Sequence, residues 1–332
     1  MTSAAWLRRM PPVDRKGDAP KMRCAKREIR MHRSSRPLRA IQAALFLLLA
    51  GCVDGGGTFV PVATVLASRP MPPAARALRL ETRVGGIRVT SASGGEIKIE
   101  AIVKANPSKV EIEKASKAFE AHVRVAEEGE VLRIEDAHKD AADREAWQVE
   151  LRVSVPRAVA VEAATGVGDV DIGVAAGDVR GRSGVGNVRL SARDIGSLRL
   201  DTGVGEVTAE TARVAGDVRA KVGTGNVALT LGGAGGSTEA EAGTGSVKVA
   251  FASAPKKDVT ASAGIGHAKI SLPADARGKF SGRAGVGSVR VTGFDGVTVK
   301  KTFVGGSISG TTGEGPTYEV KAGTGDITIE AR

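Results

Sequence analysis

The chain has 332 residues and a formal net charge of +11, but this charge is concentrated at the N-terminal end. Residues 1–52 hold 12 basic and 3 acidic side chains, so the rest of the chain is nearly neutral at +2. A near-neutral body with interspersed charges lacks the basic patch that nucleic acid requires, and no nucleic-acid partner is expected. The only cysteines are Cys24 and Cys52, which excludes a disulfide framework or a thiolate metal site in the residues that follow.

Residues 1–51 are predicted to form a signal peptide. A basic segment precedes an apolar run of about 11 residues, from Ala40 to Ala50, which is far shorter than the roughly 20 residues needed to span a bilayer. Translation from Met1 gives a basic region of 39 residues, whereas translation from Met31 gives an ordinary leader of 21 residues. These proportions favour Met31 as the true start.

The segment Leu49-Ala50-Gly51-Cys52 ends the apolar run and resembles the lipobox of bacterial lipoproteins. The resemblance implies a diacylglycerol on the thiol of Cys52, cleavage just before it and acylation of the new N-terminus, so that the membrane is bound through lipid. By resemblance to the sorting rule of enteric bacteria, Val53 favours the outer membrane, in its periplasmic or surface-facing leaflet, although Asp54 weakens this inference. A simple secretory signal that precedes a cysteine by chance is the alternative.

Residues 52–76 are predicted to be the lipidated N-terminus and a flexible tether. The segment is rich in Gly, Pro and Ala, and it has no sustained hydrophobic period. A flexible chain of this length has a root-mean-square span of roughly 25 to 30 Å, enough to hold a folded domain clear of the lipid head groups.

Residues 77–332 are predicted to form a β-solenoid, with a helix-containing insertion over residues 105–148. Within the insertion, Asn106-Pro107 is typical of a helix start, and residues 108–120 contain good helix formers, so a short helix is expected there. Strand patterns return at residues 121–126, 130–135 and 147–155.

From residue 166 a Gly-x-Gly pair followed by alternating apolar residues recurs every 18 to 21 residues, a period typical of a solenoid. Each repeat has two runs of period two, which indicates two strands with one buried face. A single coil cannot bury enough apolar surface to offset the entropy of ordering it, so coils must stack. The predicted fold class is all-β, a parallel β-solenoid with coils of about 20 residues. The copies begin at Gly166, Gly184, Gly203, Gly223, Gly243, Gly264, Gly285 and Gly323, with a degenerate copy at residues 304–308.

One polar position follows the second glycine of each phrase and is expected to form a ladder along one edge. A polar groove for glycans or cations is one interpretation, and solvated turn residues are the favoured one. The acids lie two to six coils apart, roughly 10 to 30 Å, which is too far for a catalytic carboxylate pair. The histidines His122, His138 and His267 are isolated from one another, so no catalytic residue, cofactor or metal site is predicted. The ladder positions are Asp169, Asn187, Glu206, Asn226, Ser246, His267, Ser288, Ser307 and Asp326.

The C-terminal end is expected to be an open sheet edge. The final coil ends at Arg332, and no capping element follows it. Residues 324–332 would then present unpaired backbone groups that could pair end to end with another chain.

The repeated phrase and the run Leu151-Arg152-Val153-Ser154-Val155-Pro156 resemble a bacterial adhesin-like family of unknown function, over residues 77–332. The resemblance implies a right-handed parallel β-helix. With the lipobox, it implies an exported, lipid-anchored cell-envelope β-solenoid that acts as a non-catalytic binding or structural module, with an envelope glycan or envelope protein as its partner. One alternative is an envelope-stress sensor or regulator that works through a membrane protein. Another, which the sequence disfavours, is a carbohydrate-active β-helix enzyme.

Overall fold

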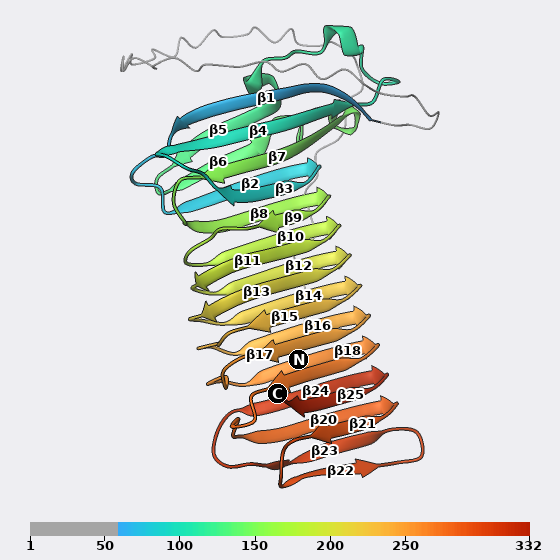
Figure 1. Cartoon of the computed structure of the whole chain (residues 1–332). Helices are drawn as coiled ribbons and strands as arrows, with labels where there is room; N and C mark the ends of the chain where they lie inside the picture. Colours follow the sequence, from blue (N-terminus) through green and yellow to red (C-terminus); the bar gives the residue numbers. More distant parts are fainter. Residues whose placement is uncertain (1–58) are drawn as a thin grey trace, which may run out of the picture. The chain divides into compact units, whose positions relative to one another are not determined.

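Two large β-sheets that face each other make up the described part of the protein, residues 59–332 of a computed structural model (Figure 1). Nearly every element is a strand, and both sheets are mainly parallel, as the repeats predict. The predictions of a signal peptide, a start at Met31 and a lipid on Cys52 fall outside these residues.

The order of the strands across each sheet differs from their order in the chain. Across the first sheet, the 12 strands are β1 (Val60–Pro70), β4 (Glu96–Ala105), β7 (Trp147–Val155), β3 (Ile87–Ser91), β9 (Val170–Ile172), β11 (Val188–Ile195), β13 (Val207–Val214), β15 (Val227–Leu231), β17 (Val247–Phe251), β19 (Ala268–Leu272), β25 (Ile327–Ala331) and β21 (Val289–Thr292). Across the second sheet, the 13 strands are β22 (Val297–Lys301), β23 (Gly306–Thr311), β20 (Lys279–Val286), β24 (Thr317–Thr324), β18 (Val259–Ile265), β16 (Thr238–Thr244), β14 (Val218–Thr224), β12 (Leu198–Val204), β10 (Val179–Val185), β8 (Ala160–Val167), β2 (Ala77–Val84), β6 (Val131–Asp136) and β5 (Val123–Glu128).

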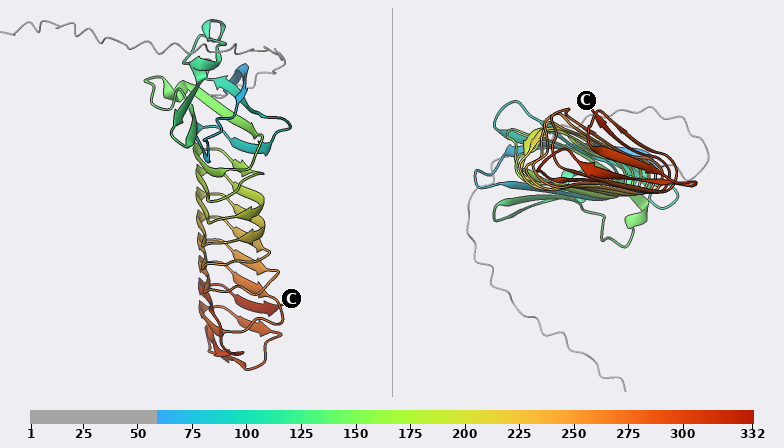
Figure 2. Two further views of the ribbon diagram at one scale, coloured as in Figure 1. Left: turned by 90° about the vertical axis from the view of Figure 1, so that its left-hand side faces the viewer. Right: turned by 90° about the horizontal axis from the view of Figure 1, so that it is seen from below.

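Each regular coil gives one strand to each sheet. β10 runs along the second sheet, the chain turns at Gly186 and Asn187, and β11 continues in the first sheet. The strands of the next coil pair with them in parallel, so that Val188 lies beside Val207. Equivalent polar residues of adjacent coils are 18 to 21 positions apart in sequence. Figure 2 shows the coils as flattened loops stacked on one another.

The core lies between the two sheets and is built from repeated columns of side chains. In β12, Leu198 and Leu200 are buried and Arg199 is exposed, as the period-two pattern predicts. Leu200 is followed in the next two coils by Ala220 and Ala240. Such small residues let the two sheets approach each other, which explains the flattened section of the stack.

The Gly-x-Gly corner requires glycine because successive coils approach closely there. Gly225 has a φ of +134°, and a Cβ atom on it would lie 1.7 Å from the carbonyl oxygen of Gly205 in the preceding coil. The first glycine of the phrase is also confined, since a Cβ atom on Gly223 would lie 2.5 Å from the oxygen of Gly203. The residue between the two glycines points outward, and Val204 is 51% exposed.

The N-terminal end of the stack contains a strand where a tether is predicted. Residues 60–70 form β1, which pairs antiparallel with β4 along its whole length. The β-branched and apolar residues of this segment favour a strand, and Val65 is buried. Pro61 and Pro70 are tolerated because β1 is an edge strand and they lie near its ends. The tether prediction is therefore wrong for residues 60–70.

The insertion is mostly strand and irregular chain. β5 and β6 form a hairpin on the second sheet, close to the predicted bounds. The helix predicted over residues 108–120 is reduced to the short 3-10 helix η1 (Ile112–Lys114) and a single turn, α1 (Phe119–His122), and another 3-10 turn, η2 (Arg144–Ala146), precedes β7. Neither η1 nor α1 has a side-chain N-cap, and only α1 has buried residues, so little stabilises a longer helix.

The C-terminal end is not an open edge, contrary to the prediction. β24 lies between β18 and β20, and β25 lies between β19 and β21, so the last coil is inside the stack. The antiparallel hairpin of β22 and β23 covers the end of the second sheet instead. The degenerate phrase at residues 304–308 leads into β23 and does not begin a regular coil, because β23 pairs antiparallel with β20.

His122 and His138, which look isolated in the sequence, are in direct contact beside β7. The Nδ1 atom of His122 lies 2.8 Å from Nε2 of His138, and its Nε2 atom lies 2.7 Å from the carbonyl oxygen of Ser116. Because the carbonyl can only accept, His122 Nε2 carries a proton, and in a neutral ring Nδ1 then accepts from His138 Nε2. The His138 ring also stacks on Trp147, with centroids 4.4 Å apart. Burial, which lowers the pKa of His122, favours this neutral form.

We expect the Gly225→Ala substitution to destabilise the stack strongly. The new Cβ would collide with the backbone of Gly205, and alanine disfavours a φ of +134°. The loss should be about 3 kcal/mol or more, or roughly 5 to 10 °C in Tm, measured by thermal unfolding followed by circular dichroism. Gly95→Ala is the matched control, because nothing lies within 4 Å of a Cβ atom there. Equal Tm values for the two variants would contradict the close-approach explanation.

We expect the free energy of unfolding to fall between pH 6.5 and pH 4. Burial lowers the pKa of His122, and burial and the neighbouring His122 lower the pKa of His138 from 6.5 to about 4. The unfolded chain therefore takes up protons first as the pH falls, which favours unfolding by about 2 kcal/mol once the partial exposure of His138 is allowed for. Burial raises the pKa of Asp136, which opposes this loss at the lower end of the range.

Urea titrations at pH 7 and pH 4.5 measure this effect. His138→Gln should reduce the difference in unfolding free energy between the two pH values, since glutamine does not titrate. Lys248→Gln, at an exposed position of β17, is the control and should leave the difference as in the wild type. An unchanged difference in His138→Gln would show that other groups cause the pH dependence.

Candidate binding site

The predicted polar ladder exists, and its side chains bond to the backbone of the adjacent coil. The Oδ1 atom of Asp169 accepts from the backbone N–H of Asn187 at 2.7 Å, and Asn187 Oδ1 accepts from the N–H of Glu206 at 2.9 Å. In the same way, Asn226 Oδ1 accepts from the backbone N–H of Ser246. These bonds occupy oxygens that a glycan or a cation would otherwise use, so this edge has a structural role.

Beyond His267, the ladder follows the order of the strands in the sheet and not their order in the chain. The backbone N–H of Asp326 donates to Nδ1 of His267 at 3.2 Å, and Asp326 Oδ1 accepts from the N–H of Ser288 at 2.7 Å. Ser307 is not part of the ladder, because it lies on the antiparallel strand β23 opposite Arg283. That one assignment in the predicted ladder is wrong.

A second ladder, absent from the sequence-based predictions, lies where the chain enters the second sheet. Asp178 accepts hydrogen bonds from the backbone and the hydroxyl of Ser197, and Asp217 accepts the same pair from Ser237. These hydrogen bonds lower the pKa of both carboxyls. The sequence signal for this ladder is a Gly-[Asp/Ser] pair just before β10, β12, β14 and β16, as at Gly216-Asp217.

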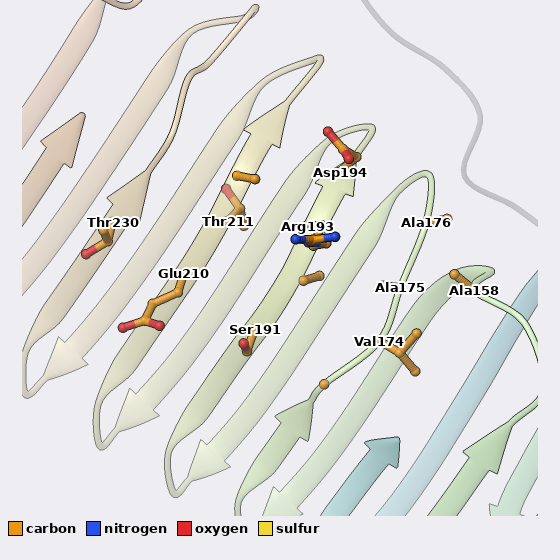
Figure 3. A pocket seen from close by; sticks show the side chains of 13 residues that line it. Ala158, Val174, Ala175, Ala176, Ser191, Arg193, Asp194, Glu210, Thr211 and Thr230 are labelled. Carbon is orange, nitrogen blue, oxygen red and sulfur yellow. The ribbon is translucent and has the colours of Figure 1, made fainter. Parts of the chain in front are cut away.

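A groove of about 760 Å³ lies on the first-sheet side, beyond the end of β9 (Figure 3). β9 stops at Ile172, whereas β11 and β13 in the next two coils continue for several residues further. Residues 173–177 therefore follow an irregular path, and a hollow opens beside them. Its lining includes several small residues, namely Ala158, Gly173, Ala175, Ala192 and Ala212.

Polar side chains from successive coils surround this groove. Ser191, Glu210 and Thr230 lie side by side on β11, β13 and β15, and Figure 3 shows them in a row across the coils. Arg193 and Asp194 stand at a neighbouring position. Asp194 is held by Arg213, at 3.2 Å.

Arg193 and Glu210 are two exposed, oppositely charged residues that line the groove. Several charges of adjacent coils pair elsewhere, as in Lys221–Glu241 at 3.0 Å and Lys269–Glu330 at 2.7 Å. Within residues 59–332, neither Arg193 nor Glu210 has an ion-pair partner or a side-chain hydrogen bond, although both are exposed beside the groove. Charges that lack a partner in the free protein are available to a ligand.

Thr211 adds an unsatisfied polar group to the groove lining. The residue is only 7% exposed, and its Oγ1 atom has no hydrogen-bond partner in the described part of the chain. A buried hydroxyl without a partner carries a desolvation cost. No sequence pattern indicates this groove, because it results from one strand that is shorter than its neighbours.

The described residues show neither a metal-binding cluster nor a membrane-spanning helix. Over residues 59–332, no three His, Cys, Asp or Glu side chains cluster in a way that could hold a metal ion. Asp169 and Asp171 are adjacent, but Arg189 lies 3.6 Å from each of them. No helix between residues 59 and 332 is both long enough and apolar enough to cross a membrane.

The chain resembles several solved bacterial structures at low sequence identity. A candidate adhesin from Bacteroides fragilis is 12% identical, with 80% of this chain and 96% of that chain covered and a TM-score of 0.42. A candidate cell adhesion protein from Clostridium sporogenes is 15% identical, with coverages of 80% and 99% and a TM-score of 0.28. A candidate lipid-binding protein from Parabacteroides distasonis is 11% identical, with coverages of 79% and 96% and a TM-score of 0.34.

No curated protein matches the chain. A family match is found, and it spans residues 76–330, from the start of the stacked coils almost to the last residue. On this match, the chain belongs to the Toastrack DUF4097 family.

Proposed function

We propose that the protein is a lipid-anchored, non-catalytic binding module of the bacterial cell envelope, and that the groove beside β9 binds an envelope saccharide. The observation that carries this proposal is that Arg193 and Glu210, of opposite charge, both line this hollow and have no ion-pair partner among residues 59–332. A rigid stack of coils would hold these groups in place before the ligand arrives, which reduces the entropy lost on binding.

The chemistry of the groove suits a polyhydroxylated chain. The Arg193 guanidinium donates hydrogen bonds, the Glu210 carboxylate accepts them, and the hydroxyls of Ser191 and Thr230 can do both. The small apolar side chains of the lining can contact the C–H faces of sugar rings. The row of polar residues crosses several coils, which matches an extended ligand better than a compact one.

A binding role is favoured over hydrolysis because the groove offers a single free carboxylate. Glycoside hydrolysis usually requires two carboxyl groups in defined positions. Of the two acids that line the groove, Asp194 is engaged by Arg213, which leaves Glu210.

The proposed lipid on Cys52 would set the orientation of the module. Phe59, the first described residue, lies seven positions after Cys52, and a chain of this length reaches at most about 25 Å. The N-terminal strands β1 and β4 would then lie near the membrane. The groove would lie further along the stack.

Substitution of the unpaired charges should weaken saccharide binding. We expect Arg193→Ala and Glu210→Ala each to lower the affinity for envelope saccharide about tenfold, as for the loss of a hydrogen bond to a charged group. Co-sedimentation with purified peptidoglycan sacculi, and with soluble envelope polysaccharide as competitor, measures this. Lys248→Ala, an exposed substitution on β17 of the same sheet, is the matched control. Wild-type protein that binds neither material, or variants that bind like the wild type, would contradict the proposal.

Removal of the thiol at residue 52 should release the protein from the membrane. We expect mass spectrometry of the mature N-terminus to find a diacylglycerol on Cys52 in the outer-membrane fraction. In Cys52→Ala, the protein should appear in the soluble fraction or keep its leader. An unmodified wild-type protein cleaved elsewhere would exclude the anchor, but not the binding role of the groove.

A further inference from the structure

The C-terminal coil, which we define as residues 317–332, is out of chain order in the stack. The chain passes its position through residues 273–278, forms β20 and β21 and the hairpin of β22 and β23, and then returns through residues 312–316. Only then do β24 and β25 enter the slot between β18–β19 and β20–β21 (Figure 1). The slot is bounded on both sides by residues that come earlier in the chain.

The C-terminal coil fits this slot with the register of a regular coil. Tyr318 lies beside Val259 on one side and beside Phe280 on the other. Ile327 likewise lies between Ala268 and Val289. Tyr318, Val320, Ile327 and Ile329 are all fully buried. The coil therefore supplies a complete layer of the core.

The coil also completes both polar ladders. The backbone N–H of Thr317 donates to Asp258 at 2.7 Å, and the N–H of Ser288 donates to Asp326 at 2.7 Å. The hydroxyl of Tyr318 donates to the carbonyl oxygen of Arg277 in the bypass segment, at 3.1 Å. All of these contacts are non-covalent.

A single short segment connects the C-terminal coil to the rest of the chain. Residues 312–316 include two glycines with positive φ, Gly313 at +140° and Gly315 at +155°. Five residues reach at most about 17 Å when extended. The coil could thus enter a slot in a second molecule that lies alongside the first, but not one that lies far away.

We propose that two copies of this chain exchange their C-terminal coils, each coil filling the slot of the other copy. The partner is thus a second copy of the chain. Exchange preserves every contact of the coil, because the donor and the slot are identical in both molecules, and such swapping is a low-cost route to dimers. Residues 317–332 are also synthesised after both walls of the slot, so the slot is open until they arrive.

The connecting segment sets the balance between the two forms. It holds the chain's own coil near its slot at an effective concentration in the millimolar range, so the closed monomer dominates in dilute solution. Exchange becomes competitive when copies are crowded during folding. The ratio of dimer to monomer should then rise in proportion to the protein concentration.

A pair of engineered cysteines distinguishes the two forms. Ser262 on β18 is the register partner of Lys321 on β24, and parallel neighbours lie about 4.8 Å apart, within the range that a disulfide accepts. In full-length chain with Cys24→Ser and Cys52→Ser, we would introduce Ser262→Cys and Lys321→Cys. The disulfide joins residues of one chain in the closed monomer, but joins two chains after exchange.

The matched control is Lys221→Cys with Glu241→Cys in the same background. These residues are register partners on β14 and β16, at the same position of their strands, but their coils follow each other in chain order. Both proteins are unfolded, refolded at a series of concentrations, oxidised and compared on non-reducing gels. The cysteines at 262 and 321, which we call the slot pair, should give a covalent dimer whose ratio to monomer rises about tenfold over a tenfold increase in protein concentration. The control pair at 221 and 241 should stay monomeric.

Two results would overturn the proposal: a slot pair that closes within one chain at every concentration, or equal dimer from both pairs. If neither pair oxidises, two cysteine-free copies with different tags, refolded together, decide the question. Capture through one tag should then retain the other, in an amount that rises with concentration. Failure to retain it would also overturn the proposal.

Discussion

The structure depends on the close approach of backbone atoms at the glycine corners. Parallel strands hold successive coils at the spacing that their N–H···O bonds require. At that spacing, the corner carbonyl of one coil occupies the place where a Cβ atom of the next would stand, as at Gly186, where the distance to the Gly168 oxygen would be 2.0 Å. Once the corners are fixed in this way, the register of both sheets follows.

A fixed register turns each position of the coil into a column of side chains. Columns of apolar residues fill the core, and columns of opposite charge pair along the outward faces. Asp and Asn at the two corners accept hydrogen bonds from backbone N–H groups of the adjacent coil through their side-chain oxygens. A site for another molecule is then most readily made where the repetition fails, as it does beyond Ile172, where one strand is short and charges are left without partners.

The regular part of the fold could be predicted from sequence because its signal is local. Each Gly-x-Gly phrase marks its own corner, and eight of the nine predicted ladder residues lie where the phrase places them. The spatial order of the last coils could not be predicted, because the alternation of β18, β20 and β24 is so similar that each is a suitable neighbour for the others. Strand β1 was missed because its prolines suggest loop, and His122 meets His138 through tertiary packing that spacing does not reveal.

Because the last coil lies inside the stack, loss of the C-terminal residues damages this protein more than it would damage a repeat protein that is stacked in chain order. In a solenoid stacked in chain order, loss of the final residues removes an outer layer and leaves the remainder intact. Here, a stop codon before Thr317 would delete an inner layer, and the coil of β20 and β21 would lose its attachment to β18 and β19. A prematurely terminated product would expose two strand edges and Phe280, which packs on Phe294 and loses its contact with Tyr318, and this exposure marks the product for proteolysis. Residues 317–332 thus join coils that come earlier in the chain, and those coils depend on them to stay together.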